Sequence, residues 1–400
     1  MRPARFVVSS LLSLCAVLIL PPSATLAMVR QASHSIGPVE SLAAEASDPA
    51  LLEAAKEAEQ QAGAHYNAGR YEEALRAQQQ SVQLHRELAA QDPSQRLQLA
   101  ASLHNLGVVL IRLGRKTEAI PLTEESLSLY RLESAGQAAE VPLVMERPLR
   151  NLVLLYFETN RLQEALPLAN DLVRIHQSMA AMDPLSQGER VDVLNLRASL
   201  LVALNRLKEA QQDLQVAVGL ARSLAELVPQ NLALQYGLAG TLVNLSQVAD
   251  LLQHYSQALR PAMEAEALLR QMARRQPQFT GDWGKALSRL GQAFAKVGDP
   301  SRARPPLEES ISLLRSLDRP SSAGSMAVEV GGYRDDLAHA LESLGVVLQQ
   351  LKRPEEARAA AQEAIEIYSV LARVDPRYSR DVVRTESWLS TVLRPTPAKP

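Results

Sequence analysis

Apolar and small side chains recur along this chain in a pattern that returns about every 45 residues. The clearest marker is a six-residue phrase that ends in alanine, as in Gly69 to Ala74 (Gly-Arg-Tyr-Glu-Glu-Ala) and Gly114 to Ala119 (Gly-Arg-Lys-Thr-Glu-Ala). Later copies, some of them weaker, end at Ala165, Ala210, Ala258, Ala303 and Ala357, so that successive alanines lie 45, 46, 45, 48, 45 and 54 residues apart. Seven copies at nearly constant spacing predict an array of one repeated unit, in place of the two or three domains that 400 residues usually suggest.

Each copy carries the same arrangement of side chains around its alanine. An apolar residue, almost always leucine, stands sixteen residues earlier: Ala58, Leu103, Leu149, Leu194, Leu242, Leu287 and Leu341. A mostly small residue stands twelve residues earlier: Ala62, Gly107, Val153, Ala198, Ser246, Gly291 and Gly345. Small residues recur again seven residues after the alanine, with Leu172 as the exception. Spacings of three, four and seven put such positions on one helical face, so two helices that pack closely are predicted.

The Gly-Arg or Asn-Arg step between these two patterns is typical of a helix end, because Gly and Asn tolerate the left-handed backbone of a C-cap. Glutamates such as Glu72, Glu118 and Glu164 then fall in the first turn of a second helix, where the helix dipole favours anions. Each unit is therefore predicted to be a helical hairpin. The first helices cover approximately 50–68, 95–113, 147–159, 187–204, 231–252, 279–297 and 332–350. The second helices cover approximately 71–91, 116–133, 162–181, 207–227, 256–275, 300–317 and 354–373, and several of them stop before a proline, at Asp92, Asp183, Val228, Gln276 and Asp375.

This pattern resembles the tetratricopeptide repeat proteins. The best copy has Leu103, Leu106, Gly107, Leu110 and Ala119, and Leu341, Leu344, Gly345, Leu348 and Ala357 form a close second. The resemblance covers about 45–393 and implies an all-α fold, a right-handed superhelical solenoid of about seven hairpins whose first helices line a concave face. The usual unit has about 34 residues, so the longer period here is more similar to the extended repeats of kinesin light chains and of many bacterial repeat proteins. We expect the array to span 49–376, with a loop insertion at 319–332, a capping helix at 377–393 and a disordered tail at 394–400.

The first residues of the chain have the features of a secretory signal peptide. Arg2 and Arg5 precede an apolar run from Phe6 to Leu20, which is followed by a Pro pair and small residues. We expect cleavage after Ala27, a flexible lead-in at 28–48 and a secreted or periplasmic mature chain with no membrane span. A retained signal anchor is the main alternative, and lipidation at Cys15 is a weaker one.

Composition narrows the classes of function. The formal net charge is −2, which gives no basic surface of the kind that binds nucleic acid. Cys15 is the one cysteine, so a disulfide framework and a cysteine-based metal site are excluded. Leu and Ala dominate the 46% hydrophobic share, while aromatic residues make up 4%, which favours helices.

No motif of a known catalytic class occurs: there is no phosphate-binding glycine loop, no Gly-x-Ser-x-Gly and no His-Glu-x-x-His. The nearest approach to a metal half-site is Asp335, Asp336 and His339, which share one helical face, although acids at a helix start are more simply explained by the dipole. Paired glutamates such as Glu124 and Glu125 are interpreted as solvated helix faces. We expect no catalytic residue, no metal site and no cofactor.

Asparagine recurs on the predicted first helices, and the resemblance implies that Asn on the concave face hydrogen-bonds a bound peptide backbone. Neighbouring cationic or basic side chains can add contacts to an acidic or carboxylate-bearing partner. The candidate partner-binding residues are His104, Asn105, Arg112, Arg150, Asn151, Asn195, Asn244 and Arg289. In the alternative interpretation, the asparagines cap or bridge neighbouring hairpins without any ligand. Tyr66, Tyr156, Phe157 and Phe294 are interpreted as packing residues.

A solenoid presents an extended surface instead of a deep cavity, which suits recognition of a polypeptide more than turnover of a small molecule. The sequence therefore favours a non-enzymatic scaffold or adaptor that binds a protein or peptide. A structural or self-oligomerising spacer is the alternative, and an enzyme is a remote third.

Overall fold

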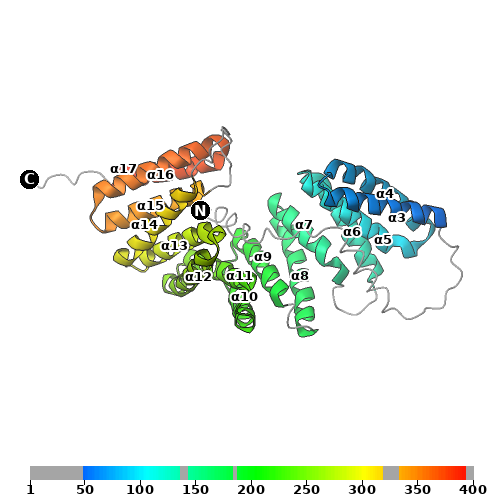
Figure 1. Cartoon of the computed structure of the whole chain (residues 1–400), viewed down its shortest axis with the longest axis horizontal. Helices are drawn as coiled ribbons and strands as arrows, with labels where there is room; N and C mark the ends of the chain where they lie inside the picture. Colours follow the sequence, from blue (N-terminus) through cyan, green and yellow to red (C-terminus); the bar gives the residue numbers. More distant parts are fainter. Residues whose placement is uncertain (1–47, 136–142, 183–186, 319–332, 393–400) are drawn as a thin grey trace, which may run out of the picture. The chain divides into compact units, whose positions relative to one another are not determined.

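The computed structural model describes residues 48–135, 143–182, 187–318 and 333–392. These residues form 15 α-helices and no strand (Figure 1), so the predicted all-α helical-repeat class is confirmed. The predicted signal peptide, nearly all of the lead-in, the loop insertion at 319–332 and the tail lie outside the described residues.

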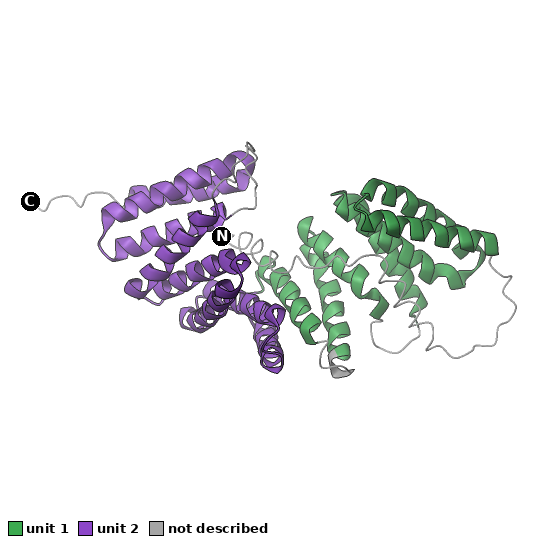
Figure 2. Ribbon diagram, in the orientation of Figure 1, with its two compact units in different colours: residues 1–206 green, residues 207–400 purple. Residues whose placement is uncertain are grey.

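The chain divides into two compact units, residues 1–206 and residues 207–400 (Figure 2). Unit 1 contains α3 (Pro49–Asn67), α4 (Tyr71–Gln91), α5 (Arg96–Arg112), α6 (Lys116–Glu133), α7 (Glu146–Glu158), α8 (Leu162–Met182) and α9 (Gln187–Ala203). Unit 2 contains α10 (Leu207–Leu227), α11 (Leu232–Leu251), α12 (Tyr255–Arg275), α13 (Thr280–Lys296), α14 (Pro300–Leu317), α15 (Arg334–Gln350), α16 (Pro354–Val374) and α17 (Ser379–Val392). Within each unit every helix packs against the next one along the chain, as expected for stacked hairpins.

All seven hairpin turns have the same backbone geometry. The second residue after the first helix has a positive φ between 60° and 84°, and the following N–H returns to the carbonyl five residues earlier, as from Arg115 to Leu110 at 2.9 Å. This is the Schellman arrangement, which satisfies carbonyls at a helix end. The left-handed residues are Gly69, Gly114, Asn160, Asn205, Gln253, Gly298 and Lys352. The predicted role of Gly and Asn at this left-handed position is confirmed. Gln253 and Lys352 adopt the same backbone conformation, although their side chains do not favour it.

Asp92 and Asp375 end second helices and begin the next element. Each has an extended backbone, and its carboxylate accepts an N–H two residues further on, from Ser94 at 2.9 Å and from Arg377 at 3.0 Å. A proline follows each aspartate and opens a short 3₁₀ turn that leads into the next helix. The predicted stops at Asp92 and Asp375 are therefore confirmed, and that at Asp183 lies outside the described residues.

The small positions let the two helices of a hairpin touch. A Cβ placed on Gly291 would lie 2.5 Å from Leu307 Cγ and 2.9 Å from the Ala303 carbonyl oxygen. Serines at the small position of the second helix also bond across the hairpin, since Ser310 Oγ donates to the Gly284 carbonyl at 2.7 Å. Close approach thus brings a hydrogen bond as well as contact.

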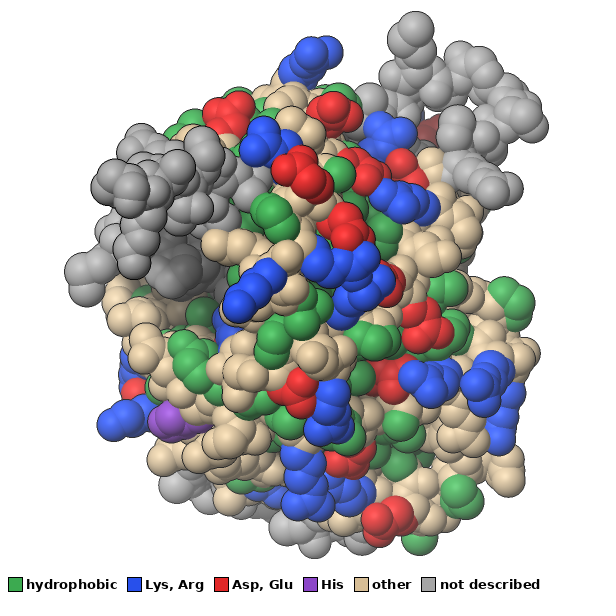
Figure 3. Space-filling view, turned by 90° about the vertical axis from the view of Figure 1, so that its left-hand side faces the viewer, with side chains coloured by type: hydrophobic (Ala, Val, Ile, Leu, Met, Phe, Trp, Pro, Cys, Tyr) green, Lys and Arg blue, Asp and Glu red, His purple; other side chains and the backbone are tan. Residues whose placement is uncertain are grey.

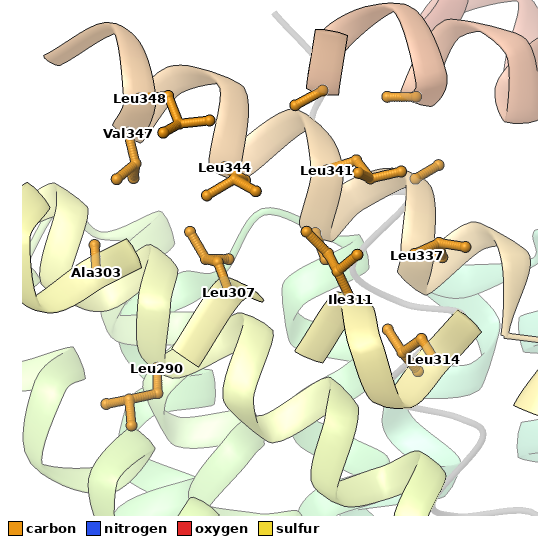
Figure 4. Close-up of a cluster of buried hydrophobic side chains, with 14 of the residues drawn as sticks. Leu290, Ala303, Leu307, Ile311, Leu314, Leu337, Leu341, Leu344, Val347 and Leu348 are labelled. Atoms are coloured by element: carbon orange, nitrogen blue, oxygen red, sulfur yellow. The ribbon is translucent and has the colours of Figure 1, made fainter. Parts of the chain in front are cut away.

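Leucines fill the space between these contacts. Leu307, Ile311 and Leu314 of α14 face Leu341 and its neighbours on α15, and together they belong to one continuous hydrophobic core of unit 2 (Figure 4). At the C-terminal end α17 packs on α16, and the Trp388 ring would contact a Cβ on Gly345 at 3.3 Å. The outward residues of α17 include Arg380, Arg384 and Glu386, which give this last helix the polar face that an array end needs.

Candidate functional site

The first helices of the hairpins carry all eight candidate residues. His104, Asn105 and Arg112 lie on α5, Arg150 and Asn151 on α7, Asn195 on α9, Asn244 on α11 and Arg289 on α13. In unit 2, α13 contacts the first helices before and after it, α11 and α15, as well as its own partner α14. The first helices of this unit therefore form a continuous layer on which side chains from successive hairpins meet.

Four of the candidates are buried. His104, Asn105, Asn195 and Asn244 are each at most 6% exposed. The Asn195 amide donates to the Val191 carbonyl on its own helix at 3.0 Å. These positions offer almost no surface to a partner, which favours the packing interpretation that the sequence left open.

His104 is buried in a neutral form. Burial, together with the nearby Arg147 guanidinium, lowers its pKa to about 4, while Glu146 acts in the opposite direction. Its Nδ1 has no hydrogen-bond partner. An uncharged imidazole at this site contributes packing and no fixed charge at neutral pH.

Arg112 and Arg150 are partly accessible but are held by neighbouring side chains. Arg112 Nε donates to the Tyr66 hydroxyl of the preceding hairpin at 2.9 Å. Arg150 Nε donates to Glu146 one turn earlier at 2.7 Å. Asn151, beside Arg150, is half-buried. Arg112 and Arg150 stand on different helices and are bonded to different neighbours.

Unit 2 does form a polar cluster around Arg289. We name it the basic pit, and it is lined by Ser246, Asp250, Tyr255, Arg289, Gln292 and Lys296 from α11, α12 and α13. Lys296 Nζ lies 2.5 Å from Asp250 Oδ2, and an Arg289 nitrogen lies 3.9 Å from the same oxygen. Two cations thus share one carboxylate, and the three side chains together carry a net positive charge.

The residues that line the basic pit also include hydrogen-bonding groups. Ser246 Oγ is fully buried and has no hydrogen-bond partner. Gln292 Nε2 donates to Ser343 Oγ of the next hairpin at 3.0 Å. Burial lowers the pKa of Arg289, against the opposing effect of Asp250, which indicates that this guanidinium has lost part of its water and gains from any added anion.

The sequence identified only Arg289 in this pit. The ion pair of Asp250 and Lys296 could have been found in the sequence, because the two residues are 46 positions apart, which is about one repeat. The same separation joins Tyr66 to Arg112 and Tyr236 to Asp282. Pairs of polar residues about one repeat apart on first helices therefore mark contacts between neighbouring hairpins.

The suggested metal half-site is occupied by internal ion pairs. His339 Nδ1 lies 2.9 Å from an Asp335 carboxylate oxygen, and Lys285 Nζ lies 3.3 Å from Asp336. Burial opposes protonation of His339, but its hydrogen bond to Asp335 and the charge of that carboxylate outweigh burial and raise its pKa to about 9. Within the described ranges, no three His, Cys, Asp or Glu side chains are arranged to hold a metal ion.

The recurring Arg-x-x-Glu of the alanine phrase is explained by local structure. Arg115 donates to both oxygens of Glu118 at 2.7 Å, and Arg161 and Arg353 pair with Glu164 and Glu356 in the same way. The pair joins the turn to the first turn of the second helix, so it serves the hairpin instead of a ligand.

A second recess lies in unit 1 between α6, α7 and α8. It measures about 310 Å³ and has Leu127, Leu152 and Leu168 among its lining residues. The carboxylates at its rim, Glu124 and Glu164, both accept from Arg161. A single guanidinium thus serves two rim carboxylates, one from its own hairpin and one from the preceding hairpin.

Acidic and basic side chains both occur on the face of the molecule that Figure 3 shows. In the face shown by Figure 3 they are interspersed, and no large area of one sign stands out among the described residues. No helix in the described ranges combines the length and the apolar character that crossing a membrane requires.

Comparison with known proteins identifies the repeat. Family models described as tetratricopeptide repeat match residues 53–131 and 337–371. These stretches cover α3 to α6 and the hairpin of α15 and α16, which include the two copies that carry the best sequence pattern. No curated protein matches the sequence significantly.

Solved structures share the arrangement of helices at low sequence identity. The apo form of RapI has a TM-score of 0.50 and 11% identity, over 80% of this chain and 99% of its own. A tetratricopeptide repeat protein from Parabacteroides merdae has a TM-score of 0.44 and 16% identity, over 84% and 99%. Repeats of a putative kinesin light chain from Podosopora anserina have a TM-score of 0.43 and 19% identity, over 56% and 97%. At such identity, the likeness to RapI concerns the fold alone.

Proposed function

We propose that this chain, which belongs to the tetratricopeptide-repeat proteins, is a non-enzymatic scaffold that binds an acidic polypeptide partner on its first helices. The fold supports a role in protein interaction, because an array of hairpins offers a long surface formed by many side chains. The proposal places the partner's carboxylates at the basic pit of unit 2.

The arrangement of Arg289 and Lys296 around Asp250 carries this proposal. One internal carboxylate cannot neutralise two cations, so an incoming carboxylate gains charge-assisted hydrogen bonds from both. The Tyr255 ring, whose centroid lies 5.8 Å from Lys296 Nζ, adds a cation–π contact to that ammonium.

Selection of random peptides on the purified protein tests the proposal. We expect enriched peptides to contain clustered Asp or Glu, and we expect Arg289→Gln with Lys296→Gln to weaken their binding at least about tenfold. Arg274→Gln with Arg275→Gln is the matched control, since it removes two exposed cations of the same unit outside the pit. Peptides without acidic residues, or an equal loss in both double variants, would contradict the assignment.

We also propose that the chain is exported, on the strength of the Arg-flanked apolar run that ends at Leu20. Mass measurement of the protein recovered from its producing cells tests this, with a new N-terminus at Met28 expected. A recovered protein that retains its first residues would instead support the signal-anchor alternative.

A further inference from the structure

His176 of α8 is a buried histidine placed between carboxylates from two other helices. Its side chain is 1% exposed. Nε2 lies 3.3 Å from Glu146 Oε1 on α7, and Nδ1 lies 3.4 Å from Glu189 Oε2 on α9. The imidazole therefore stands between its own hairpin and the first helix of the next one.

The charged groups around this ring are net negative. Glu146 and Arg150 face it from α7, and Glu189 and Asp192 face it from α9. Burial alone would raise the pKa of Glu146, but hydrogen bonds from His176 and Arg150 lower it to about 2. Glu146 thus stays ionised throughout the range in which a histidine titrates.

A neutral imidazole carries one N–H, so it can donate to only one of the two carboxylates. With its proton on Nε2 it donates to Glu146, and Nδ1 forms no hydrogen bond with Glu189. With its proton on Nδ1 it can donate to Glu189, while Nε2 can accept from Arg150 at 3.5 Å and the bond to Glu146 is lost. A protonated imidazole donates from both nitrogens and can hold both carboxylates at once.

We propose that His176 is a protonation-dependent clamp that joins α9 to the hairpin of α7 and α8 when the pH falls. Protonation supplies an N–H to both carboxylates at once, so every protonated ring can donate to Glu189, and the start of α9 opens less often at acidic pH. This inference concerns the order of unit 1 and does not depend on the partner proposed above.

The chain itself supplies a replacement for His176. Eleven residues after the motif alanine, where His176 stands in its hairpin, Tyr130 and Tyr368 are buried in two other hairpins. His176→Tyr should therefore fold while removing the titrating group. His85 occupies the same position in the first hairpin and contacts a single carboxylate, Glu59 at 3.2 Å, which makes His85→Tyr a matched control.

Hydrogen–deuterium exchange of the full chain at about pH 5 and about pH 8 tests the clamp, with rates corrected for intrinsic chemical exchange. In the wild type we expect amides in the first turns of α9 to be about tenfold better protected at the lower pH. This difference should disappear in His176→Tyr and in Glu189→Gln, whose side chain is 60% exposed and tolerates the change. It should persist in His85→Tyr and in Asp192→Asn.

Each other outcome overturns the clamp. Equal protection at both pH values in the wild type would mean that protonation does not tighten α9. A difference that survives in Glu189→Gln would exclude the bond from Nδ1, even if His176→Tyr failed to fold. Loss of the difference in Asp192→Asn would assign the response to that carboxylate instead.

Discussion

Each hairpin turn passes through one left-handed residue, and the seven residues at this position differ in how readily they adopt it. Gly69, Gly114 and Gly298 have no Cβ to clash with the carbonyl, and Asn tolerates the conformation. Gln253 and Lys352 have neither advantage, yet their turns form the same hydrogen bonds. Packing of the two helices therefore imposes the turn at these two positions, at a cost in backbone energy.

Lys352→Gly should relieve this cost. With φ at 60°, the substitution removes the Cβ clash while adding entropy to the unfolded chain, so we expect a net stabilisation of about 0.5–1 kcal/mol. Chemical denaturation of the two proteins measures the change. Asn205→Gly, at a residue that already tolerates the conformation, should change stability less, and an equal gain in both variants would contradict the explanation.

His104 makes the stability of unit 1 depend on pH on the acid side. Its folded pKa of about 4 is below the ordinary value of 6.5, so the unfolded chain takes up the proton first as pH falls. Stability contributed by the neutral ring is present above pH 6.5 and is lost between pH 6.5 and about 4, by about 2–3 kcal/mol near the lower limit.

His104→Leu should reduce this loss. Urea denaturation at pH 7 and at about pH 4.5 would show a smaller drop in the free energy of unfolding for the variant than for the wild type. The comparison within each protein removes the effect of the substitution on packing. An unchanged drop would show that other groups cause the acid sensitivity.

At the scale of helices, close contact at the small positions fixes how the two helices of a hairpin sit together. Gly291 faces a backbone carbonyl that cannot move aside without displacing α14. Gly237, on α11, has no atom within 4 Å of where its Cβ would be. A side chain at position 291 would therefore clash with α14, whereas a side chain at position 237 would meet open space.

We expect Gly291→Ala to destabilise unit 2 by about 1–3 kcal/mol, because its Cβ would overlap Leu307 and the Ala303 carbonyl. Gly237→Ala should stabilise it by about 0.5–1 kcal/mol through helix propensity alone. Thermal denaturation followed by circular dichroism would distinguish them. If both variants moved in the same direction, contact between the helices would not be the reason for glycine at position 291.

Ion pairs join the second helices of neighbouring hairpins, and they recur at the same positions of the repeat. Arg86 bonds Glu125, Arg222 bonds Glu264 and Arg315 bonds Glu363, in each case from twelve residues after one motif alanine to six residues after the next. These pairs lie at constant offsets, so they could have been predicted from the repeat alone. In the third and fourth copies of the repeat, the equivalent positions are Gln177 and Val216, which cannot form an ion pair.

The hairpins themselves were predictable because one strong period governs them, and most helix ends agree with expectation within two residues. Burial of Asn195 and Asn244 was not predictable in the same way, since a polar residue on a first helix faces either the surface or the second helix according to a rotation of a few tens of degrees. The basic pit was missed in part because its members come from three helices of two hairpins. Its charges become visible only when residues 46 positions apart are compared.

At the scale of the whole molecule, the cores are local. The hydrophobic cluster around α14 and α15 in unit 2 contains only residues between Ala262 and Leu371, with partly buried residues from Leu259 to Val382 packed on it. A second cluster, around Leu269 and Met272, also lies within that unit. Stability of this half of the chain therefore does not draw on residues far away in the sequence.

Residues 207–392 should accordingly fold when produced alone. We expect a helical circular dichroism spectrum and a cooperative thermal transition from this fragment. A fragment of the same unit that stops before α15 serves as the control and should melt at a lower temperature, because it loses Leu341, Leu344 and Leu348 from the cluster. An unfolded 207–392 fragment would show that the unit depends on the rest of the chain.

The uniform hairpin turn has a consequence for how the chain can change in length. The distance from the small position to the motif alanine is twelve residues in all seven copies, although the alanines themselves are 45 to 54 residues apart. The copies therefore differ in length only between the motif alanine and the next small position, and the Schellman turns have the same length in all of them. Insertions, epitope tags or an additional domain should be tolerated at the connections between hairpins and rejected within them, which makes the hairpin the unit that duplication or engineering can add or remove.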